Sequence, residues 1–327
     1  MKKISIVVPM YNSFHMMKRN LDVLTKQTKA EIELIIVDDC STDDSLSAAN
    51  EYASRSSFDV IVIQNEKNGG PGVCRNIGIA HATGDYVTFV DSDDYFSDNY
   101  TEILAPLLET DVDCVIYDYC PVDETGNHLA TGKSIENSAV VQGYVDARIG
   151  LTYTAGSTMC KIYRREALLR SGAQFGEYFR NEDMPFTKHA IALSESVYYC
   201  AEYLYHYVQM STSLMHNTKL LDERNCQRSF SILAERLSGR DLDRELLAIE
   251  LREVLNTTVL IKIQKKESRA SIRQYIRSHY SKAHIRNPYF ANLPKHVKII
   301  SYCAYYKSIL ALTLILKYKE HKQKKSK

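Results

Sequence analysis

Short apolar runs alternate with helical patterns through the first third of the chain. Four of these runs have the length and composition of buried strands: Ile4–Val8, Glu33–Val37, Val60–Ile63 and Tyr86–Val90. A segment of helical periodicity follows each of them, and a fifth apolar run lies at Val112–Tyr117. Strands that alternate with helices usually pair in parallel and are buried on both faces. The pattern therefore predicts an α/β fold, with a Rossmann-like, mostly parallel sheet and helices on both of its faces.

The pattern changes after about residue 120. Residues 121–138 are polar and rich in turn-forming residues, which predicts a loop or a small hairpin, and residues 197–207 form a late, tyrosine-rich strand. From about residue 219, leucine, isoleucine and valine recur at helical spacing through residue 263. We therefore expect two domains, an α/β domain over residues 1–215 and a helical C-terminal region over residues 216–327.

The end of the chain is both basic and apolar. Residues 262–327 carry 17 Lys and Arg against two acidic residues, although the whole chain has a formal net charge of +1. Residues 299–316 are apolar around Lys307, and a central lysine costs about 3 kcal/mol in a membrane-spanning helix. We therefore favour a helix that lies on an anionic membrane surface. A packing helix, or an interface of a homo-oligomer formed through the C-terminal helices, is the alternative.

Composition narrows the class of protein. A chain with 45% hydrophobic and 25% charged residues is neither disordered nor collagen-like. The eight cysteines include no C-x-x-C pair, which argues against a zinc site and favours reduced thiols. The first residues lead directly into a short apolar strand and show no signal-peptide pattern. We expect a cytoplasmic protein, peripheral at the inner face of the cell membrane.

Polar residues follow each of the first four predicted strands. They are Met10–Asn12, Asp38–Asp43, Asn68–Gly72 and Asp91–Asp94. Any one of these segments could be an ordinary turn. Because open parallel sheets bind ligands beyond the carboxyl ends of their strands, all four together favour a ligand site at one edge of the sheet.

The acidic residues at these strand ends suggest particular ligands. Asp91 and Asp93 are two residues apart at a strand end, so an extended backbone directs both carboxylates to one side. Two carboxylates placed in this way are suitable ligands for Mn²⁺ or Mg²⁺. Asp39 offers only acceptor atoms and could receive an N–H from a base. A surface turn and helix capping are the alternatives. The glycines at 69–72 form neither a dinucleotide-binding fingerprint nor a P-loop.

Taken as a set, four motifs resemble those of family 2 inverting glycosyltransferases of GT-A fold, of the bacterial surface-polysaccharide type. They are SIVVPMYN at Ser5–Asn12, IIVDDCSTD at Ile35–Asp43, NGGPGVCRNIGI at Asn68–Ile79 and YVTFVDSDD at Tyr86–Asp94. Cys40 departs from the pattern, since the family usually has glycine there, and we expect it to perturb that turn.

The resemblance implies roles for individual residues. Asp183 would be the catalytic base, and Asp93 would bind Mn²⁺ or Mg²⁺. The remaining residues would hold the nucleotide sugar: Pro9, Tyr11, Asp39, Asn68, Arg75, Asp91 and Ser92. The alternative for Asp183 is that it is an acidic residue that stabilises a helix N-terminus. His206 and His216 could reach the acceptor or the diphosphate, or could be structural.

These expectations favour one function and leave a second open. The first is a metal-dependent, inverting glycosyltransferase that moves a sugar from a UDP-sugar to a glycan or lipid-linked acceptor, in capsule, exopolysaccharide or teichoic-acid synthesis. The second is a non-catalytic GT-A-like protein recruited to membrane or nucleic acid by its basic tail. Because all four key acids are present (Asp39, Asp91, Asp93 and Asp183), we favour the enzyme and expect no nucleic-acid partner.

Overall fold

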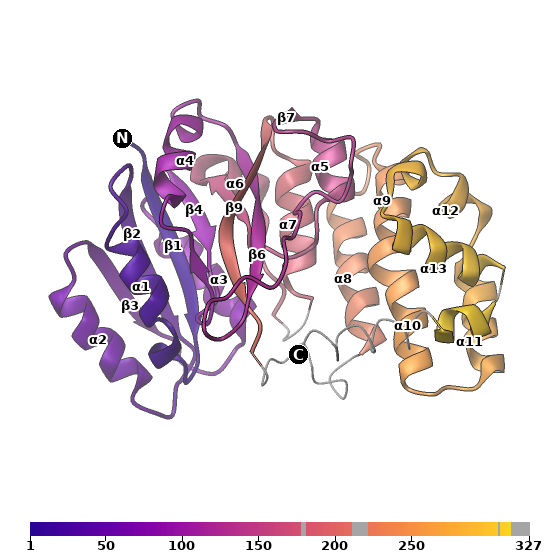
Figure 1. Cartoon of the computed structure of the whole chain (residues 1–327), viewed down its shortest axis with the longest axis horizontal. Helices are drawn as coiled ribbons and strands as arrows, with labels where there is room; N and C mark the ends of the chain where they lie inside the picture. Colours follow the sequence, from indigo (N-terminus) through magenta and orange to yellow (C-terminus); the bar gives the residue numbers. More distant parts are fainter. Residues whose placement is uncertain (178–180, 211–221, 307, 315–327) are drawn as a thin grey trace. The chain divides into compact units, whose positions relative to one another are not determined.

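The computed structural model describes residues 1–177, 181–210, 222–306 and 308–314 (Figure 1). The chain forms two compact units. The first comprises Met1–Ile135 and Val140–His216, and the second comprises Glu136–Ala139 and Asn217–Lys327. His216 and the lysine-rich end of the chain lie outside the described residues.

The first unit is built on a nine-stranded sheet with the order β3-β2-β1-β4-β8-β6-β9-β5, and β7 pairs with β9 (Figure 1). Its first four strands are parallel: β1 (Lys3–Met10), β2 (Glu31–Asp38), β3 (Asp59–Gln64) and β4 (Tyr86–Phe89). All four match apolar runs of the sequence, and the alternating side chains of β1 and β2 are buried on both faces.

The connections between these strands put helices on both faces of the sheet. The chain moves outward from β1 to β3 through α1 (Lys18–Leu24) and α2 (Ser45–Arg55), then returns through α3 (Pro71–His81) to β4. Since such crossovers are right-handed, reversing direction moves α3 to the opposite face. There Gly78 lies so close to β1 that an added Cβ would be 2.2 Å from the Val7 side chain. The reversal leaves a switch point between β1 and β4, where open sheets bind ligands.

The rest of the sheet contains both parallel and antiparallel pairs. The apolar run at Val112–Tyr117 is part of β6 (Cys114–Val122), but β8 (Lys161–Arg164) separates it from β4 and pairs antiparallel with both. Hydrophobic runs show that a strand is buried but not which strand lies beside it. The other elements of this unit are η1 (Phe14–Met16), β5 (Tyr95–Phe96), α4 (Tyr100–Leu108), β7 (Gly143–Val145), α5 (Ala147–Tyr153), α6 (Arg165–Ser171), α7 (Asp183–Ala192) and β9 (Val197–Val208).

The first strand also runs further than predicted. The predicted run ends at Val8, whereas β1 continues to Met10, and Pro9 pairs with Val37 of β2. The last β1–β4 pair is Val7 with Phe89, so Pro9 lies where the ladder with β4 has already ended. A proline without an N–H therefore breaks no hydrogen bond there.

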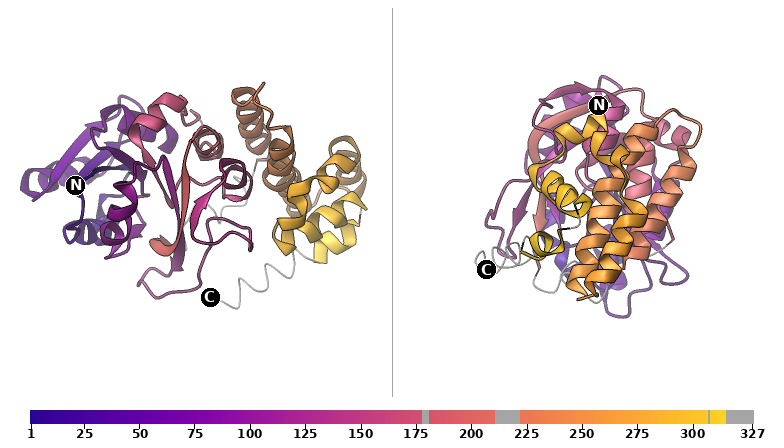
Figure 2. Two further views of the ribbon diagram at one scale, coloured as in Figure 1. Left: turned by 90° about the horizontal axis from the view of Figure 1, so that it is seen from above. Right: turned by 90° about the vertical axis from the view of Figure 1, so that its right-hand side faces the viewer.

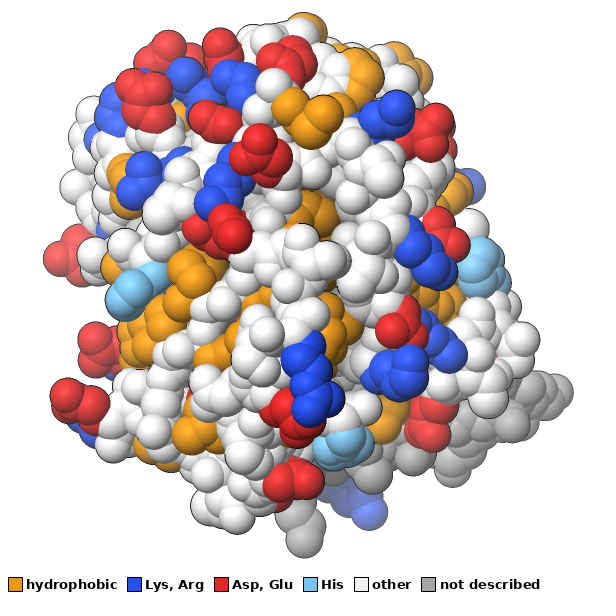
Figure 3. All heavy atoms as spheres, turned by 90° about the vertical axis from the view of Figure 1, so that its left-hand side faces the viewer, with side chains coloured by type: hydrophobic (Ala, Val, Ile, Leu, Met, Phe, Trp, Pro, Cys, Tyr) orange, Lys and Arg blue, Asp and Glu red, His pale blue; other side chains and the backbone are white. Residues whose placement is uncertain are grey.

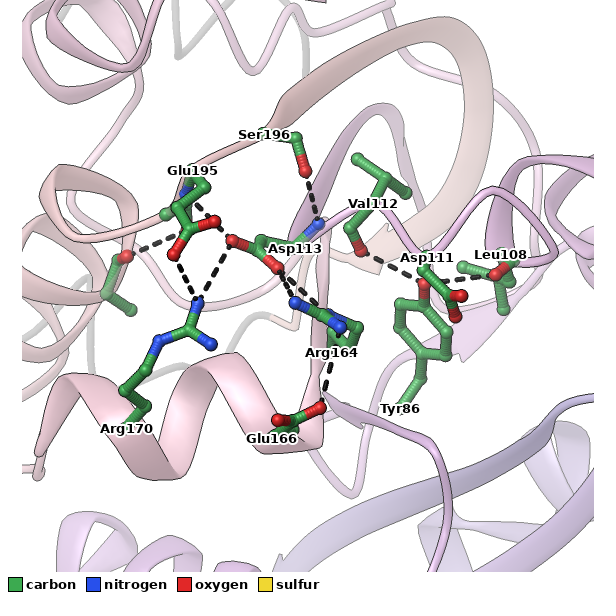
Figure 4. Close-up of polar contacts among 12 residues, drawn as sticks. Tyr86, Leu108, Asp111, Val112, Asp113, Arg164, Glu166, Arg170, Glu195 and Ser196 are labelled. Atoms are coloured by element: carbon green, nitrogen blue, oxygen red, sulfur yellow. Dashed lines mark hydrogen bonds and ion pairs between the residues drawn. The ribbon is translucent and has the colours of Figure 1, made fainter.

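A buried carboxylate fastens the edge of the sheet opposite the predicted site (Figure 4). Asp113 precedes β6, and its carboxylate accepts hydrogen bonds from Nε and Nη2 of Arg164 at 2.9 and 2.6 Å and from the Glu195 backbone N–H at 2.7 Å. Arg170 on α6 is 3.6 Å from the same carboxylate. Because these contacts join β6, the end of β8 and the turn before β9, we interpret this cluster as structural.

The face of the first unit that carries α2 and β3 mixes both signs of charge (Figure 3). Acidic and basic side chains alternate there, with hydrophobic side chains visible between them. Residues 1–261 contain 38 acidic and 24 basic residues, but this excess of acidic residues does not form a single-sign surface on that face.

The second unit is helical, as predicted (Figure 2). Helices α9 (Asp243–Ile249) and α10 (Asn256–Gln264) are joined by the π-helical turns of η4 (Glu250–Leu255), and α8, α11 and α13 all pack against α10. Among the described helices, none is long and apolar enough to cross a membrane. The remaining elements are α8 (Glu223–Arg236), α11 (Arg269–His279), α12 (Lys282–Arg286), η5 (Pro288–Asn292) and α13 (Lys295–Tyr305).

Candidate functional site

The ends of β1 and β2 are tied together by an asparagine. Asn12 adopts a left-handed backbone conformation with φ 51°. Its Oδ1 accepts a hydrogen bond from the Thr42 N–H at 2.7 Å, and its own N–H donates to Ser41 Oγ at 2.9 Å. The preceding residue, Tyr11, has a side chain that is 49% exposed. Tyr11 and Pro9, both predicted to contact the nucleotide, therefore lie at the carboxyl edge of the sheet.

Asp39, which follows β2, organises the glycine loop that precedes α3. Its buried carboxylate accepts hydrogen bonds from the N–H groups of Gly69 and Gly70, at 2.8 and 2.7 Å, and from Asn65 Nδ2 at 3.0 Å. Asn68 Nδ2 donates to the Asp39 carbonyl at 3.1 Å, so two predicted site residues meet here. A carboxylate has about four acceptor positions. The two glycine N–H groups and Asn65 use three of them, and the Cys74 thiol also hydrogen-bonds this carboxylate.

Two residues in these turns adopt left-handed backbone conformations: Gly70 in the glycine loop and Cys40 after β2. Gly70, with φ 83°, precedes the first turn of α3, which begins at Pro71. Cys40 has φ 64°, a region that costs an ordinary residue about 1–2 kcal/mol. The position requires the conformation that glycine adopts most easily, which is a physical reason for the glycine in the family pattern. Cys40 thus adopts here the backbone conformation that is easiest for glycine.

Arg75 on α3 joins two parts of the predicted site. Its side chain is almost completely buried, with Nη2 2.7 Å from Oδ1 of Asp91 and Nη1 3.0 Å from Oε1 of Glu182. The guanidinium also lies 5.4 Å from the centre of the Phe175 ring. The neighbouring acids raise the pKa of Arg75 against the opposing effect of burial, so the guanidinium stays charged. Both terminal nitrogens are engaged by protein carboxylates, which makes Arg75 a bridge between the end of β4 and the start of α7.

Asp183, the predicted base, is the first residue of α7. Withdrawal from water and the neighbouring charge of Glu182 raise its pKa to about 7, while Arg75 acts in the opposite direction. Glu182 itself is only 7% exposed. Sequence reasoning assigned Glu182 no role of its own, and the available signal was its position beside Asp183.

The loop after β4 contains the other predicted acids. Asp91 is 31% exposed, and both Ser92 and Asp93 are partly buried. Burial and the charge of Asp91 raise the pKa of Asp93 to about 6. A bound cation would offset both effects and favour the charged carboxylate. In the described parts of the chain, no three His, Cys, Asp or Glu side chains are grouped to hold a metal ion. Asp93 fits a divalent cation whose other ligands are waters and substrate phosphates.

Sequence reasoning missed the next acid, Asp94. It is 2% exposed, and its two carboxylate oxygens accept hydrogen bonds from the Tyr205 hydroxyl at 2.6 Å and the Val208 N–H at 2.7 Å. Asp94 therefore fastens the end of β9 to the loop that carries Asp93. His206, next to Tyr205, stacks on the Tyr95 ring at 4.5 Å, and burial lowers the pKa of its imidazole.

The model of the family described as glycosyl transferase family 2 matches residues 5–171. One similar protein is the poly(ribitol-phosphate) beta-glucosyltransferase of Bacillus spizizenii. It is 28% identical over 297 residues, which cover 84% of this chain and 44% of the relative. The chain thus spans less than half the length of that relative.

Solved structures show the same fold. Residues 1–349 of Staphylococcus aureus TarS, crystallised with UDP-GlcNAc, have a TM-score of 0.68 at 23% identity, covering 98% of this chain and 92% of that one. The mannosyltransferase PcManGT of Pyrobaculum calidifontis, in complex with GDP-Man and Mn²⁺, has a TM-score of 0.57 at 15% identity, covering 97% and 88%. The GT-A fold with a helical C-terminal region is therefore confirmed.

Proposed function

Because the chain belongs to glycosyl transferase family 2, we propose that it is a metal-dependent, inverting glycosyltransferase that uses a UDP-sugar. The observation that carries this proposal is the Arg75 bridge. One buried guanidinium contacts Asp91 at the end of β4 and Glu182, the residue before Asp183. The proposed nucleotide-side acid and the residue next to the proposed base are thus held by one charged group, which supports a displacement with an attacking group on one side and a leaving group on the other.

The proposed reaction is a single displacement. The hydroxyl oxygen of the acceptor attacks the anomeric carbon, and Asp183 takes the hydroxyl proton as the new C–O bond forms. The bond from the anomeric carbon to the diphosphate oxygen breaks on the opposite side, and UDP leaves with that electron pair. An α-linked donor therefore gives a β-linked product. Asp39, Asn68, Tyr11 and Pro9 are proposed to bind the nucleoside, and Asp91 and Ser92 are proposed to contact the ribose or diphosphate.

Asp93 is the residue proposed to hold Mn²⁺ or Mg²⁺. When bound, the cation would neutralise charge on the leaving diphosphate. The oxygen donor and the burial of Asp93 support this assignment. A Mn²⁺ complex also exists for PcManGT, a protein of similar fold.

The similar proteins narrow the proposed substrates. TarS was crystallised with UDP-GlcNAc, and the B. spizizenii relative is named for poly(ribitol phosphate). We propose a UDP-hexose or UDP-N-acetylhexosamine donor and a glycan, polyol-phosphate or lipid-linked acceptor in cell-surface polysaccharide synthesis. The reaction would take place at the cytoplasmic face of the membrane.

Hydrolysis of a panel of UDP-sugars with Mn²⁺, Mg²⁺ or EDTA tests this function. We expect slow UDP release that is selective for one sugar and is lost with EDTA and in Asp93→Ala. Asp98→Ala is the matched control, since its carboxylate is 74% exposed and precedes α4. Turnover that persists unchanged in EDTA and in Asp93→Ala would contradict the metal assignment.

The pKa of Asp183 predicts how activity changes with pH. A base must be deprotonated to accept a proton, so kcat/KM should rise as the pH increases through about 7. Glu182 raises this pKa through its negative charge, so Glu182→Gln should move the acidic limb of the profile to lower pH. A profile that is flat from pH 5 to pH 8 would argue against Asp183 as the base.

A further inference from the structure

The last helices of the second unit expose an unusual run of large apolar side chains. Of thirteen exposed large hydrophobic residues in the described parts of the chain, five lie between residues 299 and 314. We call these five the apolar stripe: Ile299, Tyr302, Tyr306, Leu310 and Leu314, which are 52%, 45%, 74%, 64% and 59% exposed. Ile299 and Tyr302 are three residues apart on α13 and share one of its faces, and Tyr306 directly follows the last residue of that helix. Leu310 and Leu314 are four residues apart in the helical turns of residues 309–314 and share a face there.

The same segment has a second face that is fully packed. On α13, Val297, Ile300 and Ala304 are buried, and Ile309 and Leu312 are buried in the helical turns of residues 309–314. The segment therefore does not need the stripe for its own core. An apolar face left over after packing is typical of a surface that meets another apolar phase or molecule.

The basic charge of this part of the chain indicates which kind of partner the stripe would meet. The sequence has no acidic residue between Glu267 and Glu320. Lys295 lies one helical turn before Ile299 and so shares its face on α13. Further exposed basic residues on the same unit are Arg269, Arg273 and Arg277 on α11, and Lys282 and Arg286 on α12.

We propose that the apolar stripe, with Lys295 beside it, is a docking surface for an anionic lipid bilayer, and that the other exposed basic residues of the unit strengthen the attraction to that bilayer. Leu310 and Leu314 would enter the boundary between headgroups and acyl chains, and Tyr302 and Tyr306 would lie at headgroup level. A soluble polyanion would use the basic residues but would gain nothing from exposed leucine. The inference is independent of the proposed sugar chemistry.

Vesicle co-sedimentation of the full chain tests this surface. We expect binding to vesicles of phosphatidylcholine with phosphatidylglycerol, weak binding to phosphatidylcholine alone, and release by high salt. The double variant Tyr306→Ser, Leu310→Ser should lower the partition coefficient at least about tenfold, because each side chain loses its apolar burial. Its matched control is Leu129→Ser, Val141→Ser, two exposed apolar residues of the first unit that should leave binding unchanged.

The same experiment, together with light scattering, tests the role of the basic residues and the possibility that the stripe joins two copies of the chain. Arg273→Gln, Arg277→Gln should weaken binding to anionic vesicles, whereas Lys18→Gln, Arg55→Gln on the first unit should not. Failure of the wild type to bind at low salt, or equal binding by the stripe variant, would overturn the proposal. So would a stripe variant that lowers the mass in light scattering while vesicle binding stays the same, because the stripe would then join two copies. UDP binding in solution is measured separately, so a failure of the proposed transferase function would be recognised as such.

Discussion

Replacing Asp183 with asparagine should abolish most sugar transfer while leaving donor binding intact. General-base catalysis contributes about 10²–10⁴-fold to a rate, and an amide cannot accept the acceptor proton in the same way. Asparagine keeps the size of the side chain, so α7 should still begin at the same residue. The measurement is kcat with the donor identified from the UDP-sugar panel, together with the affinity for UDP.

Asp98→Asn is the control for this experiment, because it makes the same chemical change at an exposed carboxylate of the same unit. It should change kcat by less than about twofold, since surface substitutions rarely perturb a structure. An Asp183→Asn enzyme with near wild-type kcat would remove the base from the mechanism. Loss of both UDP binding and folding would instead show that Asp183 has a structural role.

Replacing Arg75 with methionine should lower the free energy of unfolding more than any other substitution proposed here. Two carboxylates, those of Glu182 and Asp91, would lose their shared cation, and Glu182 is almost completely buried. Leaving a buried charge unpaired costs about 3–5 kcal/mol. Chemical denaturation should therefore show a decrease of this size in the free energy of unfolding. Arg55→Met, at an exposed arginine paired with Glu51, should change it by at most about 0.5 kcal/mol.

The bridge also predicts a rescue. In Arg75→Met, a second change of Glu182→Gln removes the charge that has lost its partner, so the double variant should recover part of the lost stability. Additive losses would mean that Arg75 and Glu182 do not interact as the structure shows. Because Arg75 sits between the nucleotide side and the base, we expect both variants to lose transfer activity whether or not stability is recovered.

Much of the fold could be predicted because it depends on local patterns. Four apolar runs became the four parallel strands, and the helical periodicity after residue 219 became the second unit. The family was identified from motifs at the strand ends and is confirmed by the match over residues 5–171. Strand order beyond β4 was not predictable, because the chain between β4 and β6 gives no sign that β8 will later insert between them.

The site was predictable as a set of residues but not as a network. The sequence shows that Asp39 follows one strand and Asn68 another, but it does not show that the Asp39 carboxylate accepts the Gly69 and Gly70 N–H groups. Arg75 was expected to help hold the nucleotide sugar. Its contact with Glu182 joins residues 107 positions apart, which no local pattern reveals.

The interpretation of the last helices needed both sequence and structure. Hydropathy showed that the segment from residue 299 is apolar, but hydropathy cannot separate buried positions from exposed ones when both are apolar. The structure separates Ile300 and Leu312, which are packed, from Leu310 and Leu314, which are exposed. Within residues 309–314 helical spacing agrees with this division, because Leu310 and Leu314 are four residues apart and share a face on which Leu312 does not lie.

The most direct test of the central claim is a calorimetric titration of the full chain with UDP in the presence of Mn²⁺. We expect saturable binding of one UDP per chain. This binding should be weakened by EDTA and by Asp93→Ala, and left unchanged by Asp98→Ala. Absence of UDP binding to a folded protein with Mn²⁺ present would contradict it, and would favour a GT-A-like protein that binds a different ligand.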